Sequence, residues 1–108
     1  MEYLIFDEIK EIIDLYGVHT KSLLNKKIIG PDSAIYTIKD DYGHKYVLYQ
    51  TDYISELEFE RKTIEQESGE KVDCFIKLIT PNSSLAKNED YIAENGTVWL
   101  YVLMRVKI

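Results

Sequence analysis

The sequence predicts an α+β fold in which an N-terminal amphipathic helix packs on an antiparallel sheet of four or five strands. Three observations support this class. Apolar residues recur at helical spacing near the N-terminus, and several later runs rich in β-branched and aromatic residues are separated by turn signals. The length of 108 residues leaves little material for a second hydrophobic core. We therefore expect residues 1–108 to form a single domain.

The first predicted element is a helix from Glu2 to Tyr16. Its apolar residues return every three or four positions, and its acidic residues fall largely on the other side. The apolar residues are Ile5, Ile9, Ile12, Ile13 and Tyr16, and the acidic residues are Asp7, Glu8, Glu11 and Asp14. Gly17 follows at the position where a left-handed residue commonly ends a helix.

A β-hairpin is predicted over Ala34 to Gln50. The runs AIYTIK and KYVLYQ are both rich in strand-forming residues, and they flank DDYGH, where Gly43 can supply the positive φ of a bulged turn. The segment before the hairpin is less regular. Within it we interpret Lys27 to Ile29 as a short strand that ends at the turn signal GPDS.

Residues 53–67 fit two structures. The helix interpretation has strong propensity, a capping box from Ser55 to Glu58 and a stop at Gly69. The strand interpretation alternates Leu57 and Phe59 with glutamates, but glutamate is a poor strand former. The main objection to the helix is that Phe59 lies off its apolar face. We favour the helix narrowly, and the strand remains the alternative.

Two more strands complete the predicted sheet. The run VDCFIKLI, from Val72 to Ile79, ends at a turn that contains Pro81. A polar loop follows, with an edge strand at Tyr91 to Ala93. The final run, Thr97 to Lys107, has apolar residues on both faces, which is typical of a central strand covered on both sides.

The composition predicts a cytoplasmic protein. The 19 acidic residues exceed the 13 basic ones, giving a net charge of -6, which opposes direct binding to nucleic acid or an anionic membrane. The single cysteine cannot form an internal disulfide, and we find no signal peptide and no run approaching the roughly 20 apolar residues of a membrane span. An excess of lysine, isoleucine, tyrosine and glutamate is typical of AT-rich genomes and suggests a low-GC bacterium or one of its mobile elements.

No catalytic or cofactor motif is recognised. The glycines are isolated at turn positions and do not form a phosphate cradle. His19, His44 and Cys74 lack the spacing of metal ligands, so we expect neither metal nor cofactor. We interpret Asp40, Asp41 and His44 as turn residues and Cys74 as a small buried hydrophobe. An enzyme with an unrecognised carboxylate or Cys74 site remains an alternative.

The order of hairpin, helix and strands resembles the small lobe of kinase-like phosphotransferases. That resemblance implies a strand lysine paired with a helix glutamate. In KYVLYQ, however, Tyr49 stands about where the lysine is expected, and 108 residues leave no room for a catalytic lobe. We therefore do not assign the chain to this family.

Abundant tyrosine and acid are the remaining features, and together they predict a binding protein whose partner is another protein with a basic surface. Tyrosine is enriched in protein interfaces. The candidate contact residues are Asp7, Glu11, Asp14, Tyr42, Tyr46, Glu56, Glu58 and Glu60. The main alternative is a structural or assembly subunit, either of phage type or a homo-oligomer.

One form of the binding function is an inhibitor of a nucleic-acid-binding protein. Alternate glutamates on a strand would lie about 6.8 Å apart, whereas one DNA strand carries a charge about every 3.4 Å. A single acidic row therefore has half the required charge density. Mimicry of nucleic acid would need a second row, for which the helix bearing Asp7, Glu11 and Asp14 is the candidate.

Overall fold

The computed structural model describes residues 4–54, 56–79 and 99–107, with the side chains of residues 57 and 74–79 outside the description. It contains two helices and a five-stranded antiparallel sheet. The helices are α1 (Phe6–Asp14) and α2 (Leu57–Ser68), and the strands are β1 (Thr20–Gly30), β2 (Ser33–Asp40), β3 (Lys45–Thr51), β4 (Val72–Ile79) and β5 (Leu100–Val106). The α+β class and the N-terminal helix packed on the sheet are confirmed.

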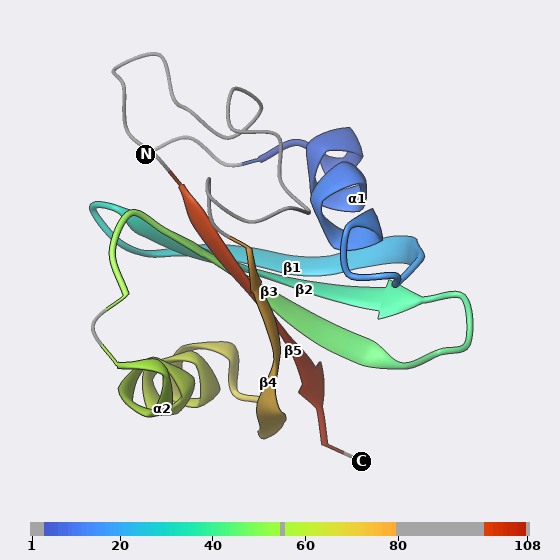
Figure 1. Cartoon of the computed structure of the whole chain (residues 1–108). Helices are drawn as coiled ribbons and strands as arrows, with labels where there is room; N and C mark the ends of the chain where they lie inside the picture. The colour runs from blue at the N-terminus through green and yellow to red at the C-terminus, as the bar shows by residue number, and fades with distance from the viewer. Residues whose placement is uncertain (1–3, 55, 80–98, 108) are drawn as a thin grey trace.

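The two helices cover opposite faces of the sheet (Figure 1). The strand order is β1-β2-β3-β5-β4, so β1 and β4 are the edges and β5 lies between β3 and β4. Because side chains alternate between the faces of a strand, the sheet divides the hydrophobic core into two clusters. The fold is therefore three layers, with α1 on one side and α2 on the other.

The cluster beneath α1 is built around three isoleucines of the helix. Ile9, Ile12 and Ile13 point from the helix toward the sheet, at the spacing expected for one helical face. From the sheet, the buried partners are Ala34, Tyr36, Ile38, Tyr46, Leu48, Tyr101 and Leu103. The start of α1 is also fixed by polar contacts, because the Ile5 N–H donates to the Glu8 carboxylate at 2.9 Å.

The cluster beneath α2 is built around Ile64, which is fully buried. Its partners from the strands are Ile35, Val47, Tyr49, Val72, Val102, Met104 and Val106. On β5, residues 101 and 103 belong to the first cluster and residues 102 and 104 to the second. The prediction of a central C-terminal strand covered on both faces is thus confirmed.

The predicted hairpin is confirmed, and so is a helix within the segment 53–67. This helix begins later than predicted, at Leu57, and its N-cap is Glu56, so the predicted capping box from Ser55 to Glu58 is wrong. Strands β2 and β3 pair in regular antiparallel register, and Gly43 in their turn has a φ of +84°. Helix α2 ends at Gly69, whose φ of +73° is the left-handed conformation that the stop signal predicts. The strand alternative for this segment is wrong, since residues 57–68 are helical.

The first strand was underestimated. Instead of a short strand at Lys27 to Ile29, β1 runs over 11 residues and pairs with β2 along its length. Its pairing contains register shifts near Ser22, Asn25 and Gly30. Such bulges break the two-residue alternation by which a strand is recognised in a sequence. The predicted edge strand at Tyr91 to Ala93 lies outside the described residues.

Candidate functional site

The eight predicted contact residues do not form one surface. Three lie on the exposed side of α1: Asp7, Glu11 and Asp14. Tyr42 lies in the turn between β2 and β3 and is 86% exposed. Because α1 and α2 lie on opposite faces of the sheet, the sheet separates the acidic residues of α1 from those at the start of α2 (Figure 1).

Two of the eight residues are buried. Tyr46 belongs to the core cluster beneath α1. Glu60 is buried where α2 meets the sheet, and its carboxylate accepts a hydrogen bond from the Tyr49 hydroxyl at 2.9 Å. A buried residue offers no surface to a partner, so Tyr46 and Glu60 are not carried further as contact residues.

The neighbours of Tyr49 make this a small polar cluster inside an apolar layer. The Ser33 hydroxyl lies 3.4 Å from the Tyr49 hydroxyl and 3.0 Å from the Thr51 hydroxyl. Burial raises the pKa of Tyr49, and the adjacent Glu60 raises it further. Tyr49 therefore stays a neutral donor, as a buried carboxylate partner requires.

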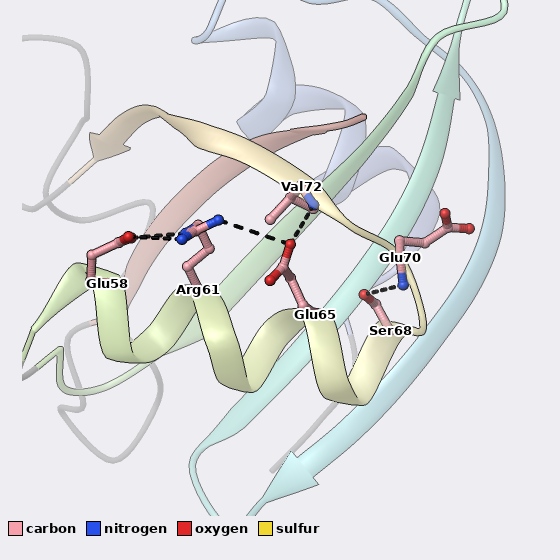
Figure 2. Close-up of polar contacts among 6 residues, drawn as sticks. All are labelled: Glu58, Arg61, Glu65, Ser68, Glu70 and Val72. Carbon is pink, nitrogen blue, oxygen red and sulfur yellow. Dashed lines mark hydrogen bonds and ion pairs between the residues drawn. The ribbon is translucent and has the colours of Figure 1, made fainter. Parts of the chain in front are cut away.

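Glu58 is exposed, but its charge is already paired. The Arg61 guanidinium donates to both Glu58 carboxylate oxygens at 2.8 Å, a bidentate contact shown in Figure 2. These hydrogen bonds, with the charges of Arg61 and Lys62, hold the pKa of Glu58 below its ordinary value. Glu58 thus offers less free negative charge to a partner than its exposure implies.

The same row of α2 ties the helix to β4. Glu65 accepts the Val72 N–H at 2.9 Å, and Arg61 lies 4.0 Å from the Glu65 carboxylate (Figure 2). The Val72 hydrogen bond is the main reason that the pKa of Glu65 is lowered, with Lys71, Arg61 and Lys107 adding to it. Glu58, Arg61 and Glu65 therefore serve to hold α2 and β4 together. The ion pairs among the described residues do not include Glu56, the N-cap of α2.

Two large exposed aromatic side chains lie within three residues of Glu56 in the sequence. Tyr53 precedes the helix and is 70% exposed, and Phe59 lies in its first turn and is 62% exposed. The chain at Tyr53 is held by Thr51, whose hydroxyl contacts both the N–H and the carbonyl of residue 53. We call Asp52, Tyr53, Glu56 and Phe59 the acidic aromatic surface. All four are exposed.

The sequence contained a signal for this surface. Phe59 was the main objection to the helix because it fell off the apolar face, yet the segment is helical and Phe59 is exposed. Glu56 is the N-cap of α2, and Phe59 lies in the first turn that follows it. An aromatic residue displaced from the buried face of a confirmed helix is a candidate contact residue.

The structure also locates the residues considered for metal binding. Asp40 accepts the N–H groups of Tyr42 at 2.9 Å and His44 at 2.8 Å, so it forms the turn as predicted. His19 lies 3.7 Å from both Asp14 and Asp41. Within the described part of the chain, no group of three or more potential ligands could hold a metal ion. The prediction for the Cys74 side chain concerns a residue whose side chain is outside the description.

The Tyr49–Glu60 contact can be compared with the lysine–glutamate pair that the phosphotransferase resemblance implies. In that small lobe, a lysine of the third strand pairs with a glutamate of the following helix and with nucleotide phosphates. Here the third strand and the following helix are joined by the Tyr49–Glu60 hydrogen bond at 2.9 Å. The contact in this chain is therefore made by a neutral hydroxyl, whereas the resemblance implies an amine at that position.

None of the helices in the described ranges has the length and apolar character needed to cross a membrane. Comparison of the sequence with protein-family models found no match. Searches of curated proteins and of solved structures likewise found no match.

Proposed function

We propose that this chain is a small cytoplasmic binding protein that acts through contact with another protein, using the acidic aromatic surface at the start of α2. The observation that carries the proposal is the exposure of Phe59, an apolar side chain that α2 turns away from the sheet. Large exposed apolar groups beside polar ones are typical of protein-binding sites.

The chemistry of the surface indicates the chemistry of the partner. Tyr53 and Phe59 supply rigid aromatic area, which often contributes most of the binding energy at an interface. Asp52 and Glu56 supply negative charge at its rim, which favours a partner with a basic surface around an apolar pocket. This charge would mainly speed association and would weaken as salt is added.

The surface can be tested by differential capture from a host lysate. We compare wild type with the double variant Phe59→Ser/Glu56→Lys and with the matched control Tyr42→Ser/Glu11→Lys. The control makes similar changes in charge and aromatic content on other exposed residues. We expect wild type and the control to capture a protein with a basic surface. The Phe59/Glu56 variant should not capture this protein.

The loss of affinity for that protein should be about 30-fold or more, as for an aromatic hot spot. Thermal melts by circular dichroism establish that both variants remain folded. Identical captured proteins for all three chains would contradict the proposal. A captured protein that itself binds nucleic acid, and that loses DNA when the chain is added, would make the chain an inhibitor of the kind that mobile elements encode.

One observation favours a second candidate function. The element order along the chain and the Tyr49–Glu60 contact resemble the small lobe of kinase-like phosphotransferases, with the phosphate-binding amine replaced. The second candidate is a small-lobe-like module that docks on another protein and has no nucleotide function. Calorimetric titration with Mg-ATP tests this second candidate. Measurable binding would show that the module recognises nucleotide, which would contradict a function without nucleotide.

A further inference from the structure

An open depression lies at the opposite end of α2 from the acidic aromatic surface. It has a volume of about 360 Å³ and is formed where the β2–β3 turn approaches the end of β5 and the segment between α2 and β4. Its polar lining residues are His44, Lys45, Glu70, Arg105 and Lys107. Small-molecule sites commonly have volumes of roughly 300–1,000 Å³.

The charge of this depression is opposite to that of the chain. Three of its residues are basic, although the chain as a whole has a net charge of -6. The one carboxylate, Glu70, lies 3.0 Å from the Lys45 ammonium. None of the described ion pairs uses Arg105 or Lys107, although the charge of Lys107 helps to lower the pKa of Glu65. The local balance is therefore positive.

Backbone hydrogen bonds of the sheet hold the main chain at Arg105 and Lys107. Arg105 lies in β5 opposite Tyr46, and its neighbour Val106 pairs with Val72 and packs in the α2 core. The Lys107 N–H donates to the Lys71 carbonyl at 2.8 Å. Sites on paired strands hold their side chains more reproducibly than sites on loops.

We propose that this depression binds the phosphate group of a small molecule. The planar guanidinium of Arg105 can donate two parallel hydrogen bonds to phosphate oxygens, and Lys107 supplies a second charge. Lys45, which is paired with Glu70, also lines the depression. An extended polyanion is a poor fit because the acidic residues elsewhere on the chain would repel it.

The proposal is independent of the function proposed above. Helix α2 has 12 residues, so the two sites are separated by about 18 Å along its axis. A change at Arg105 or Lys107 removes no atom of the acidic aromatic surface. Failure of phosphate binding would therefore leave the protein-binding proposal standing, and the reverse is also true.

The test is a titration with inorganic phosphate and, in parallel, with phenyl phosphate. Binding is monitored through amide chemical shifts, and sodium chloride keeps the ionic strength constant. We expect saturable shifts for residues 43–45 and 105–107. The variants Arg105→Gln and Lys107→Gln should each weaken binding about 10-fold or more, because each loses a charge-assisted contact. The exposed Lys62→Gln on α2 is the control and should bind as wild type does.

Lys107 is exposed, so its variant tests the site even if the half-buried Arg105 proves necessary for folding. Shifts that do not saturate, or that the Arg105 and Lys107 variants leave unchanged, would identify an adventitious ion only. Equal chemical-shift changes with phosphate, sulfate and chloride would also identify an adventitious ion only. Either result overturns the proposal.

Discussion

The hydrogen bond between Tyr49 and Glu60 shows how one side chain can affect the stability of this fold. Their hydrogen bond joins β3 to α2 across an otherwise apolar layer. Replacing Tyr49 with phenylalanine removes the donor and leaves the buried carboxylate without it. We expect the free energy of unfolding to fall by about 1–3 kcal/mol, measured by urea denaturation.

The matched control for that variant is Tyr53→Phe, which removes a hydroxyl from an exposed tyrosine. Its free energy of unfolding should stay within about 0.5 kcal/mol of wild type. If the two variants unfold at the same urea concentration, the Tyr49–Glu60 bond does not contribute to stability as argued.

Asp40 makes stability depend on pH. Burial raises the pKa of Asp40, but the N–H groups of His44 and Tyr42 and the charge of His44 more than offset this, and the pKa lies below its ordinary value. A lowered pKa gives stabilisation that is present above the ordinary aspartate value and is lost as pH falls through the lowered one. Wild type should therefore lose stability below about pH 4.

The variant Asp40→Asn keeps the acceptor oxygen but does not titrate. It should be less stable than wild type at neutral pH, and the difference should shrink as the pH falls below about 4. Urea midpoints measured from neutral to acid pH check this, with the exposed Asp32→Asn as control. A difference between Asp40→Asn and wild type that stays constant over the whole range would contradict the prediction.

At the scale of elements, the spacing of apolar residues was sufficient to predict a helix or strand wherever its period along the sequence was unbroken. The isoleucines of α1 and the regular register between β2 and β3 follow directly from spacing. Strand β1 was missed because its bulges disturb the alternation. The burial of Glu60 was missed for a different reason: whether a helical glutamate faces solvent depends on which element it packs against, and spacing does not contain that information.

Helix α2 ends at a residue whose identity is required by its conformation. Gly69 has a φ of +73°, and a Cβ added there would meet nothing within 4 Å. The cost of Gly69→Ala is therefore conformational, about 1–2 kcal/mol, with no steric part. Gly30→Ala is the control, because Gly30 is equally uncrowded and its φ is not positive.

Urea denaturation should separate the two glycine variants, with Gly69→Ala destabilised and Gly30→Ala equal to wild type or slightly more stable. Equal loss of stability in both would show that space around the glycine, and not its φ, decides the cost.

For the whole molecule, the open question is whether the sheet continues into a second copy, as the homo-oligomer alternative requires. The exposed edge at β1 has features that oppose strand addition. Its register shifts bend the strand, and Lys21, Lys26 and Lys27 are exposed along it. Bulges and edge lysines are recurrent means by which proteins avoid edge-to-edge pairing. The geometry of β1 thus favours a free chain over an assembly built through this edge.

We therefore expect a monomer of 12.7 kDa at all concentrations, measured by size-exclusion chromatography with light scattering. Replacing Asn25 and Lys26 with valine removes polar groups from a bulged part of the edge and should cause association that increases with concentration. The control, Lys62→Val on α2, alters an exposed lysine away from either edge and should remain monomeric. A wild-type chain that forms a defined large oligomer would instead support the assembly function. In that case hydrogen exchange along β1 would tell whether this edge is the interface, because its amides would become protected only if a second strand pairs there.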